Sequence, residues 1–271
     1  MLQAGSTTPT IPVLDAAYQG TLRFRSPDVN KRAVVTVRLC LLDEDGKVLH
    51  DTAVTLDIFP NQEVDLSRIY VIGKPGGKAT QLADEIGGKR VGEGPMKADD
   101  VILIDDLQAF NKLQKQVVQA VRDGARAVFL ELPKGKHQIG GAEITVGGTV
   151  GGTTGKLHFV SRATGHRLVE GFQPEDFKFW YDGRVDRPSP LLKKPAFSGP
   201  GWEPILLSHN ALAAGWKGDG NGHWCICQIE LAGRTSGNPV AFMFAQRLLS
   251  GGPVGQVLWQ QSYQIPDILH D

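Results

Sequence analysis

Apolar and polar residues alternate along the first part of the chain with the period of two that is typical of β-strands. The alternation runs through Ala33–Leu42 and again through Lys47–Ile58, and the dipeptide Asp45-Gly46 lies between the two runs. Because both runs are rich in β-branched residues, the sequence predicts an antiparallel hairpin. Together with a shorter alternating run at Thr21–Arg25, it indicates a small β-sandwich-like module over residues 13–67. About four strands fit there, against about seven in an immunoglobulin-like sandwich, so the module is either minimal or incomplete.

From residue 69 onward the pattern changes to short, continuous apolar runs that are separated by segments with helical spacing. The apolar runs are Ile69–Ile72, Val101–Ile104 and Ala127–Leu130. Between them, apolar residues recur every three or four positions, first at Leu82, Ala83 and Ile86 and then at Phe110, Leu113, Val117 and Val121. Strands that are apolar on both faces and alternate with helices are typical of a parallel sheet covered by helices on two sides. We therefore predict an α/β domain over residues 68–252.

The rest of this domain has a less regular pattern. Seven glycines between residues 140 and 155 predict a flexible loop or an irregular hairpin. Asn238-Pro239 is a favourable start for a last helix, because asparagine is a good N-cap and proline a good first helical residue, and Gly251-Gly252 ends it. Further strands are predicted at Leu157–Val160, Pro204–Ser208 and Trp224–Leu231.

Charge and composition narrow the class of partner. Lysine plus arginine and aspartate plus glutamate both number 29, so the chain lacks the basic surplus that nucleic acid or an anionic membrane attracts. No run approaches the roughly 18 apolar residues of a membrane span, and Met1–Ser6 lack the features of a signal peptide. We expect residues 1–12 to be a tail or linker and residues 253–271 a C-terminal extension; the compartment stays open.

Acidic residues follow two of the predicted strands. Asp105 and Asp106 come directly after the strand 101–104, and Glu131 comes directly after the strand 127–130. The carboxyl ends of parallel strands are where open α/β sheets bind their ligands, so these three carboxylates, with a histidine, are candidates for acid–base catalysis. The alternative is that Asp105 or Asp106 caps the helix that follows.

Two motifs look like cofactor or metal sites but lack a required feature. Gly73–Thr80 lies between a strand and a helix, where phosphate-binding loops lie, yet Ala79 stands where such a loop needs serine or threonine. His223, Cys225 and Cys227 would share one face of a strand. Same-face neighbours are about 6.7 Å apart on a strand, too far for three ligands of one zinc ion. The sequence therefore predicts that Gly73–Thr80 is a plain turn between strand and helix, and that Cys225 and Cys227 are core thiols of a buried strand. It predicts neither a cofactor nor a metal ion.

Four large aromatic residues near glycine and proline turns are candidates for stacking on a sugar. They are Trp180, Tyr181, Trp202 and Trp216. The alternative is that they anchor the core, which is the commoner role of large aromatic residues near turns.

The order of the motifs in the α/β domain resembles that of class I glutamine amidotransferase-like domains. The resemblance is carried by the run Val101–Asp106, the helix after it, and the run Asp123–Glu131. It implies a flavodoxin-like parallel sheet, with a cysteine nucleophile at the tip of the strand after the helix. Glu131 takes that position in this chain, and a carboxylate cannot act as a thiolate nucleophile.

Degenerate domains of this type occur in the non-catalytic C-terminal parts of β-galactosidase-like glycoside hydrolases, and further segments are similar to those proteins. These segments are His166–Phe172, Pro174–Tyr181, Gly199–Leu206, Cys227–Leu231 and Asn238–Ala241. The resemblance implies an accessory region that packs on or completes a catalytic barrel located elsewhere. Its partner would be a catalytic glycosidase domain or subunit, or a second copy of the chain. The alternatives are a stand-alone hydrolase that uses Glu131, Asp105 and Asp106, and a carbohydrate-binding module.

Overall fold

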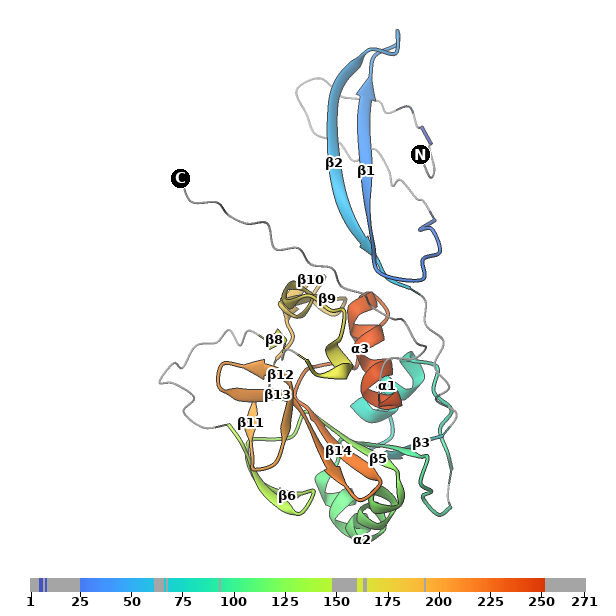
Figure 1. Cartoon of the computed structure of the whole chain (residues 1–271). Helices are drawn as coiled ribbons and strands as arrows, with labels where there is room; N and C mark the ends of the chain where they lie inside the picture. Colours follow the sequence, from blue (N-terminus) through green and yellow to red (C-terminus); the bar gives the residue numbers. More distant parts are fainter. Residues whose placement is uncertain are drawn as a thin grey trace. The chain divides into compact units, whose positions relative to one another are not determined.

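The structure is a computed structural model, and it divides into two compact units, residues 1–61 and 62–271 (Figure 1). The finer domain boundaries that the sequence suggests stay predictions. Several predicted segments lie wholly or mostly outside the described residues. They are the tail 1–12, the run 21–25, the glycines beyond residue 147, the strand 157–160 and the extension 253–271. The structure describes residues 5, 6, 8, 25–60, 66, 68–92, 94–147, 160–162, 165–192 and 194–251.

The first unit contains a long antiparallel hairpin of β1 (Ala33–Leu42) and β2 (Val48–Ile58). Asp43 closes its turn, because the Asp43 carboxylate accepts hydrogen bonds from the backbone N–H groups of Asp45 (3.1 Å) and Lys47 (2.7 Å). The hairpin predicted from the period of two is confirmed.

The two faces of this hairpin differ in polarity. Val35 lies opposite Leu56 and Val37 lies opposite Val54, so the side chains of these two pairs share one face. On the other face Arg38 lies opposite Ala53 and diagonally across from Asp51, and the side chains of Arg38 and Asp51 form an ion pair of 2.6 Å. We call the face that carries Val35, Val37, Val54 and Leu56 the apolar hairpin face; Val54 is 48% exposed and Leu56 is 36% exposed.

The second unit is built on a ten-stranded mixed sheet (Figure 1). Four of its strands are parallel, in the order β3, β4, β5 and β14. The α/β fold class is confirmed. The elements of this parallel half are β3 (Ile69–Ile72), α1 (Lys78–Glu85), β4 (Val101–Ile104), α2 (Leu107–Asp123), β5 (Arg126–Leu130) and β14 (Gly222–Cys227).

The core of the parallel half follows directly from the sequence pattern. All four residues of β4 are buried, and so are the last four residues of β5. Helix α2 contributes Phe110, whose ring meets the ring of Phe129 edge to face at 4.9 Å. Gly124 ends α2 with φ +137°, a conformation that favours glycine.

The remaining strands of the sheet are antiparallel, which the apolar runs did not predict. Beyond β14 the sheet continues through β13, β11, β7 and β6. Strand β12 branches from β13, and β8 pairs with β12. Gly140 and Gly141, with φ +60° and +71°, form the turn between β6 and β7, so the first part of the glycine-rich segment is a regular hairpin. These strands are β6 (Gly135–Ile139), β7 (Ala142–Val146), β8 (Ser161–Arg162), β11 (Phe197–Ser198), β12 (Glu203–Ser208) and β13 (Ala211–Asp219).

A separate two-stranded hairpin and a C-terminal helix complete the second unit. The predicted last helix is α3 (Pro239–Ser250), with Asn238 at its N-cap, and Gly251 at φ +84° ends it. No helix among the described residues could span a bilayer. The remaining elements are two short 3₁₀ helices, η1 (Arg167–Val169) and η2 (Pro174–Phe177), and the strands β9 (Phe179–Asp182) and β10 (Arg187–Pro190).

Candidate functional site

The carboxyl edge of the parallel strands brings together the three carboxylates that the sequence singled out. Asp105 and Asp106 follow β4, and Glu131 follows β5, the neighbouring strand. The N-terminus of α1, which begins at Lys78 after β3, lies at the same edge. Each carboxylate is engaged by a different group of the chain.

Asp105 fills the turn between β3 and α1. Its Oδ2 accepts a hydrogen bond of 2.9 Å from the backbone N–H of Ala79, in the first turn of α1. A Cβ atom on Gly73 would lie 2.0 Å from Asp105 Oδ1, and one on Gly77 would lie 2.6 Å from Asp105 Oδ2. The turn is therefore glycine-rich because a carboxylate occupies it. Asp105 supplies to α1 the cap that Gly77, at the N-cap position, cannot supply.

Asp106 caps the helix that follows it. Its Oδ1 accepts hydrogen bonds from the backbone N–H groups of Gln108 (2.8 Å) and Ala109 (3.1 Å) at the start of α2. The capping alternative predicted from the sequence is thus the geometry found for Asp106, whereas Asp105 caps a different helix.

Glu131 stands at a strained turn directly after β5. Its φ angle of +50° lies in the left-handed region, which residues other than glycine rarely adopt. Its own N–H donates to the Cys227 carbonyl (2.8 Å), and the Gln228 side chain accepts from the N–H of Leu132 (2.8 Å). The carboxylate is buried and forms an ion pair with Lys78 Nζ. This is the position where the resemblance to amidotransferase-like domains would place a cysteine.

A thiolate nucleophile is missing from this edge among the described residues. Cys225 and Cys227 lie on the buried strand β14, as predicted, and both thiols are free. Burial raises the pKa of both thiols, that of Cys227 to about 12. The remaining cysteine, Cys40, lies on β1 in the first unit. In the described part of the chain, no group of three or more His, Cys, Asp or Glu side chains is placed to hold a metal ion.

The opposite end of β5 and β14 carries an arginine–imidazole contact. Arg126 Nε donates a hydrogen bond of 2.7 Å to His223 Nε2, and the guanidinium also reaches the carbonyl of Leu249 at the end of α3. Burial, followed by the charges of Arg126 and Arg167, lowers the pKa of His223 to about 3. The imidazole is therefore neutral near pH 7 and serves as an acceptor.

Three of the four aromatic candidates for sugar contact are buried. Trp180 is 3% exposed, Trp202 7% and Trp216 8%, so their rings are not open platforms and this part of the prediction needs correction. The Trp180 indole N–H donates to the Asp176 carbonyl (2.7 Å), and the Trp216 ring stacks on His223 with centroids 3.6 Å apart. Tyr181 is the exception, with 43% of its surface exposed.

Sequence reasoning missed a buried ion network in the second unit. Arg234 is fully buried, and its Nη2 lies 2.7 Å from Glu230 Oε2 and 3.2 Å from Asp182 Oδ2. The half-exposed Arg184 contacts the same two carboxylates, at 2.8 Å for Asp182 and 2.9 Å for Glu230. The hydrogen bonds to Asp182 and then to Glu230 raise the pKa of Arg184. Two positive and two negative groups therefore balance within the network.

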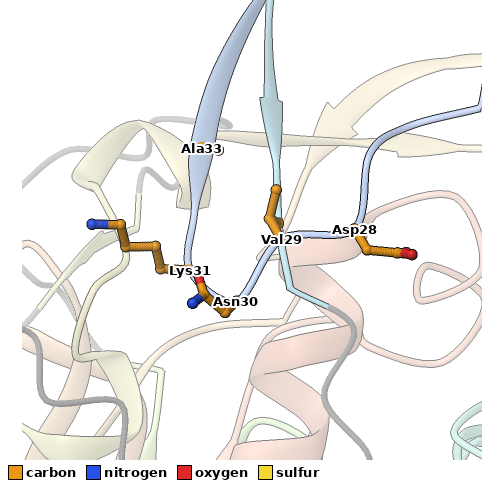
Figure 2. Close-up of a pocket in the computed structure, with 5 residues that line it drawn as sticks. All are labelled: Asp28, Val29, Asn30, Lys31 and Ala33. Atoms are coloured by element: carbon orange, nitrogen blue, oxygen red, sulfur yellow. The ribbon is translucent and has the colours of Figure 1, made fainter. Parts of the chain in front are cut away.

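An open hollow lies at the start of β1 in the first unit (Figure 2). Figure 2 shows the side chains of Asp28 and Lys31 pointing in opposite directions. Because a ligand site needs polar groups that converge, we do not regard this hollow as a candidate site. It is lined by Asp28, Val29, Asn30, Lys31 and Ala33.

Comparisons with known proteins give a distant similarity in structure. No family model matches the chain, and no curated protein matches it. Among solved structures, the chain is similar to the cold-adapted β-galactosidase from Rahnella sp. R3, with a TM-score of 0.41 and 12% sequence identity. The match covers 70% of this chain and 32% of the other, so the chain spans about a third of that protein's length.

Proposed function

We propose that the chain is a non-catalytic accessory region of a glycoside hydrolase of the β-galactosidase type. The observation that carries this proposal is the ion pair between Glu131 and Lys78 at the carboxyl edge of the sheet. An acid–base catalyst has to exchange protons with a substrate. Glu131 instead lies buried against a lysine of its own chain, and Asp105 and Asp106 accept hydrogen bonds from helix N-termini. The three carboxylates at the edge where a substrate could bind are thus engaged by groups of the chain itself.

The glycoside hydrolase assignment is supported by the sequence resemblance described above. Its segments fall on elements of the second unit such as η1, β12 and α3. The two carboxylates with which a glycosidase cleaves its substrate have no counterpart among the resembling segments. The catalytic residues would therefore belong to a barrel elsewhere.

The apolar hairpin face supports a role in assembly. A two-stranded sheet is marginally stable in water unless a third strand or another element covers its apolar side. Val54 and Leu56 are among the exposed apolar side chains of this hairpin. We propose that this face packs against the catalytic domain or subunit of the glycosidase.

Affinity purification from the source organism tests the proposal. The full chain, carrying an affinity tag, is isolated under native conditions, and the eluate is assayed with a chromogenic β-galactoside. We expect hydrolysis in the native eluate and none with the recombinant chain alone. The double variant Val54→Lys/Leu56→Lys should lower the co-purified activity at least tenfold. Val34→Lys is the matched control, because Val34 is 66% exposed but lies on the opposite face.

Two results would contradict the proposal. One is hydrolysis of the galactoside by the recombinant chain alone. The other is a native eluate without glycosidase activity although the wild-type chain is folded and recovered intact.

A further inference from the structure

The hairpin of β9 and β10 presents a small, rigid apolar face. Tyr181 lies directly opposite Pro188, and Phe179 directly opposite Pro190. Because paired and alternate residues of two antiparallel strands share a face, these four side chains form one surface, which we call the β9–β10 platform. Phe179 is 46% exposed and Tyr181 is 43% exposed. Figure 1 shows the hairpin in yellow.

The opposite face of the hairpin is fixed in the core of the second unit. Trp180 and Asp182 are buried there, and Asp182 belongs to the ion network with Arg234. The Asn238 side chain also holds the backbone of Tyr181, because its Oδ1 accepts from the Tyr181 N–H (3.0 Å) and its Nδ2 donates to the Tyr181 carbonyl (3.0 Å). The aromatic rings are therefore carried on a backbone that is ordered before any ligand binds, which lowers the entropic cost of binding.

Polar groups adjoin the aromatic surface. The Tyr181 hydroxyl donates a hydrogen bond to the Asp186 carboxylate, in the turn between the two strands. Asp186 has a φ of +49°, a left-handed conformation that only a few non-glycine residues adopt. Gly183 and Gly237 lie beside the Tyr181 ring and have no side chains that could cover it. The platform thus combines two half-exposed aromatic rings with a carboxylate and a hydroxyl.

We propose that the β9–β10 platform binds a β-galactoside. A galactopyranose ring has one face of C–H groups, which suits the rings of Phe179 and Tyr181. Its rim carries hydroxyl groups, which suit the Asp186 carboxylate and the Tyr181 hydroxyl. A stable protein interface needs about 800 Å² and 20–30 residues on each side, far more than the four side chains of this platform. The choice of a galactoside rests on the proposed function.

Titration of the full chain with methyl β-D-galactopyranoside and with lactose tests this inference, with ligand-detected NMR as the readout. We expect saturable binding with a Kd of the order of 1 mM. The double variant Phe179→Ala/Tyr181→Ala should weaken it at least tenfold. Tyr181→Phe, which keeps the ring and loses the bond to Asp186, should weaken it a few-fold. Val34→Ala/Leu49→Ala is the matched control, since both residues are exposed apolar side chains of the first unit. It should leave binding unchanged.

The outcomes separate this inference from the proposed function. Galactoside binding that is absent, or equally strong in Phe179→Ala/Tyr181→Ala, overturns the platform. A third result also overturns it: the wild type binds no galactoside, and the platform variant loses the co-purified glycosidase activity. The face would then be a protein interface. Platform variants that lose sugar binding but keep the co-purified activity support it. Far-ultraviolet circular dichroism and the urea midpoint of each variant confirm that it is folded.

Discussion

The two units of this chain treat their apolar residues in opposite ways. In the second unit the sheet and its helices bury theirs: all four residues of β4 and the side chains of Phe110 and Phe129 are inaccessible. In the first unit a two-stranded hairpin leaves many exposed. Seven of the ten exposed large apolar side chains among the described residues lie on β1 and β2, and the other three lie on the β9–β10 hairpin.

This difference separates the part of the chain that buries its own apolar surface from the parts that leave apolar side chains exposed to a partner or a ligand. A parallel sheet covered by helices buries its own apolar surface. The carboxylates at its edge form hydrogen bonds and an ion pair with groups of the same chain. The two hairpins are the places where contacts outside the chain would lower the free energy most. The predictions below test this separation, from the largest expected effect to the smallest.

The largest effect is expected at the buried ion network of the second unit. Arg234→Met removes the buried guanidinium from the carboxylates of Asp182 and Glu230, which keep the half-exposed Arg184 as a cationic neighbour. Breaking a buried pair by removing one partner costs about 3–5 kcal/mol. Urea unfolding should show this loss. Arg184→Met should cost clearly less, because Arg234 still pairs with both carboxylates. Equal losses for the two variants would contradict the larger contribution of the buried arginine.

A smaller loss is expected at the closed carboxyl edge. Lys78→Met leaves the buried Glu131 carboxylate without its partner and should cost about 2 kcal/mol, since the lysine is 40% exposed and water partly compensates. Adding Glu131→Gln removes the unpaired charge and should recover part of the loss. Urea unfolding of the two single variants and the double variant measures the coupling. A coupling near zero would contradict the ion pair.

The acid stability of the second unit should depend on His223. Its pKa is about 3 in the folded chain and about 6.5 when unfolded, so the unfolded state binds more protons between these values. Stability is therefore complete above pH 6.5 and falls as the pH decreases toward 3, by at most about 1 kcal/mol per pH unit. His223→Gln keeps an acceptor for Arg126 and does not titrate, so its unfolding free energy should fall less between pH 6.5 and pH 4. Parallel pH profiles for both proteins would contradict this assignment.

The smallest effect on stability is expected on the apolar hairpin face. Val54→Lys/Leu56→Lys should change the unfolding free energy of the second unit by less than about 0.5 kcal/mol, because both residues lie in the other unit and are exposed. Hydrogen exchange of β4 and β5 amides measures this directly. A loss of protection there would show that the second unit depends on the hairpin.

Local periodicity was sufficient to predict the regular elements of the fold. The bounds of β1, β3 and β4 coincide with the predicted runs, and α2 and α3 begin beside the predicted capping residues Asp106 and Asn238. The antiparallel strand β13 was missed, because its sequence Ala-Leu-Ala-Ala-Gly-Trp-Lys-Gly-Asp contains no β-branched residue and does not alternate. Strand β14 ends at Cys227, earlier than predicted, since Gln228 turns to bond Leu132 and Pro195.

The chemistry of the site was harder to predict, because its partners are far apart in the sequence. Position alone identified Asp105, Asp106 and Glu131 as carboxylates at one sheet edge. That Asp105 reaches Ala79, and that Lys78 reaches Glu131 across 53 residues, follows only from the packing of α1 against that edge. For the same reason the sequence could offer burial of the aromatic candidates only as an alternative, and could not single out Tyr181 as the exposed one.

The most direct test of the account is the activity of the chain by itself. The purified wild-type chain and Glu131→Gln are incubated with chromogenic β-galactosides and esters, and hydrolysis is followed at several pH values. We expect no turnover above the uncatalysed rate for either protein, because the Glu131 carboxylate is paired with Lys78. Turnover by the wild type that is abolished in Glu131→Gln would contradict it.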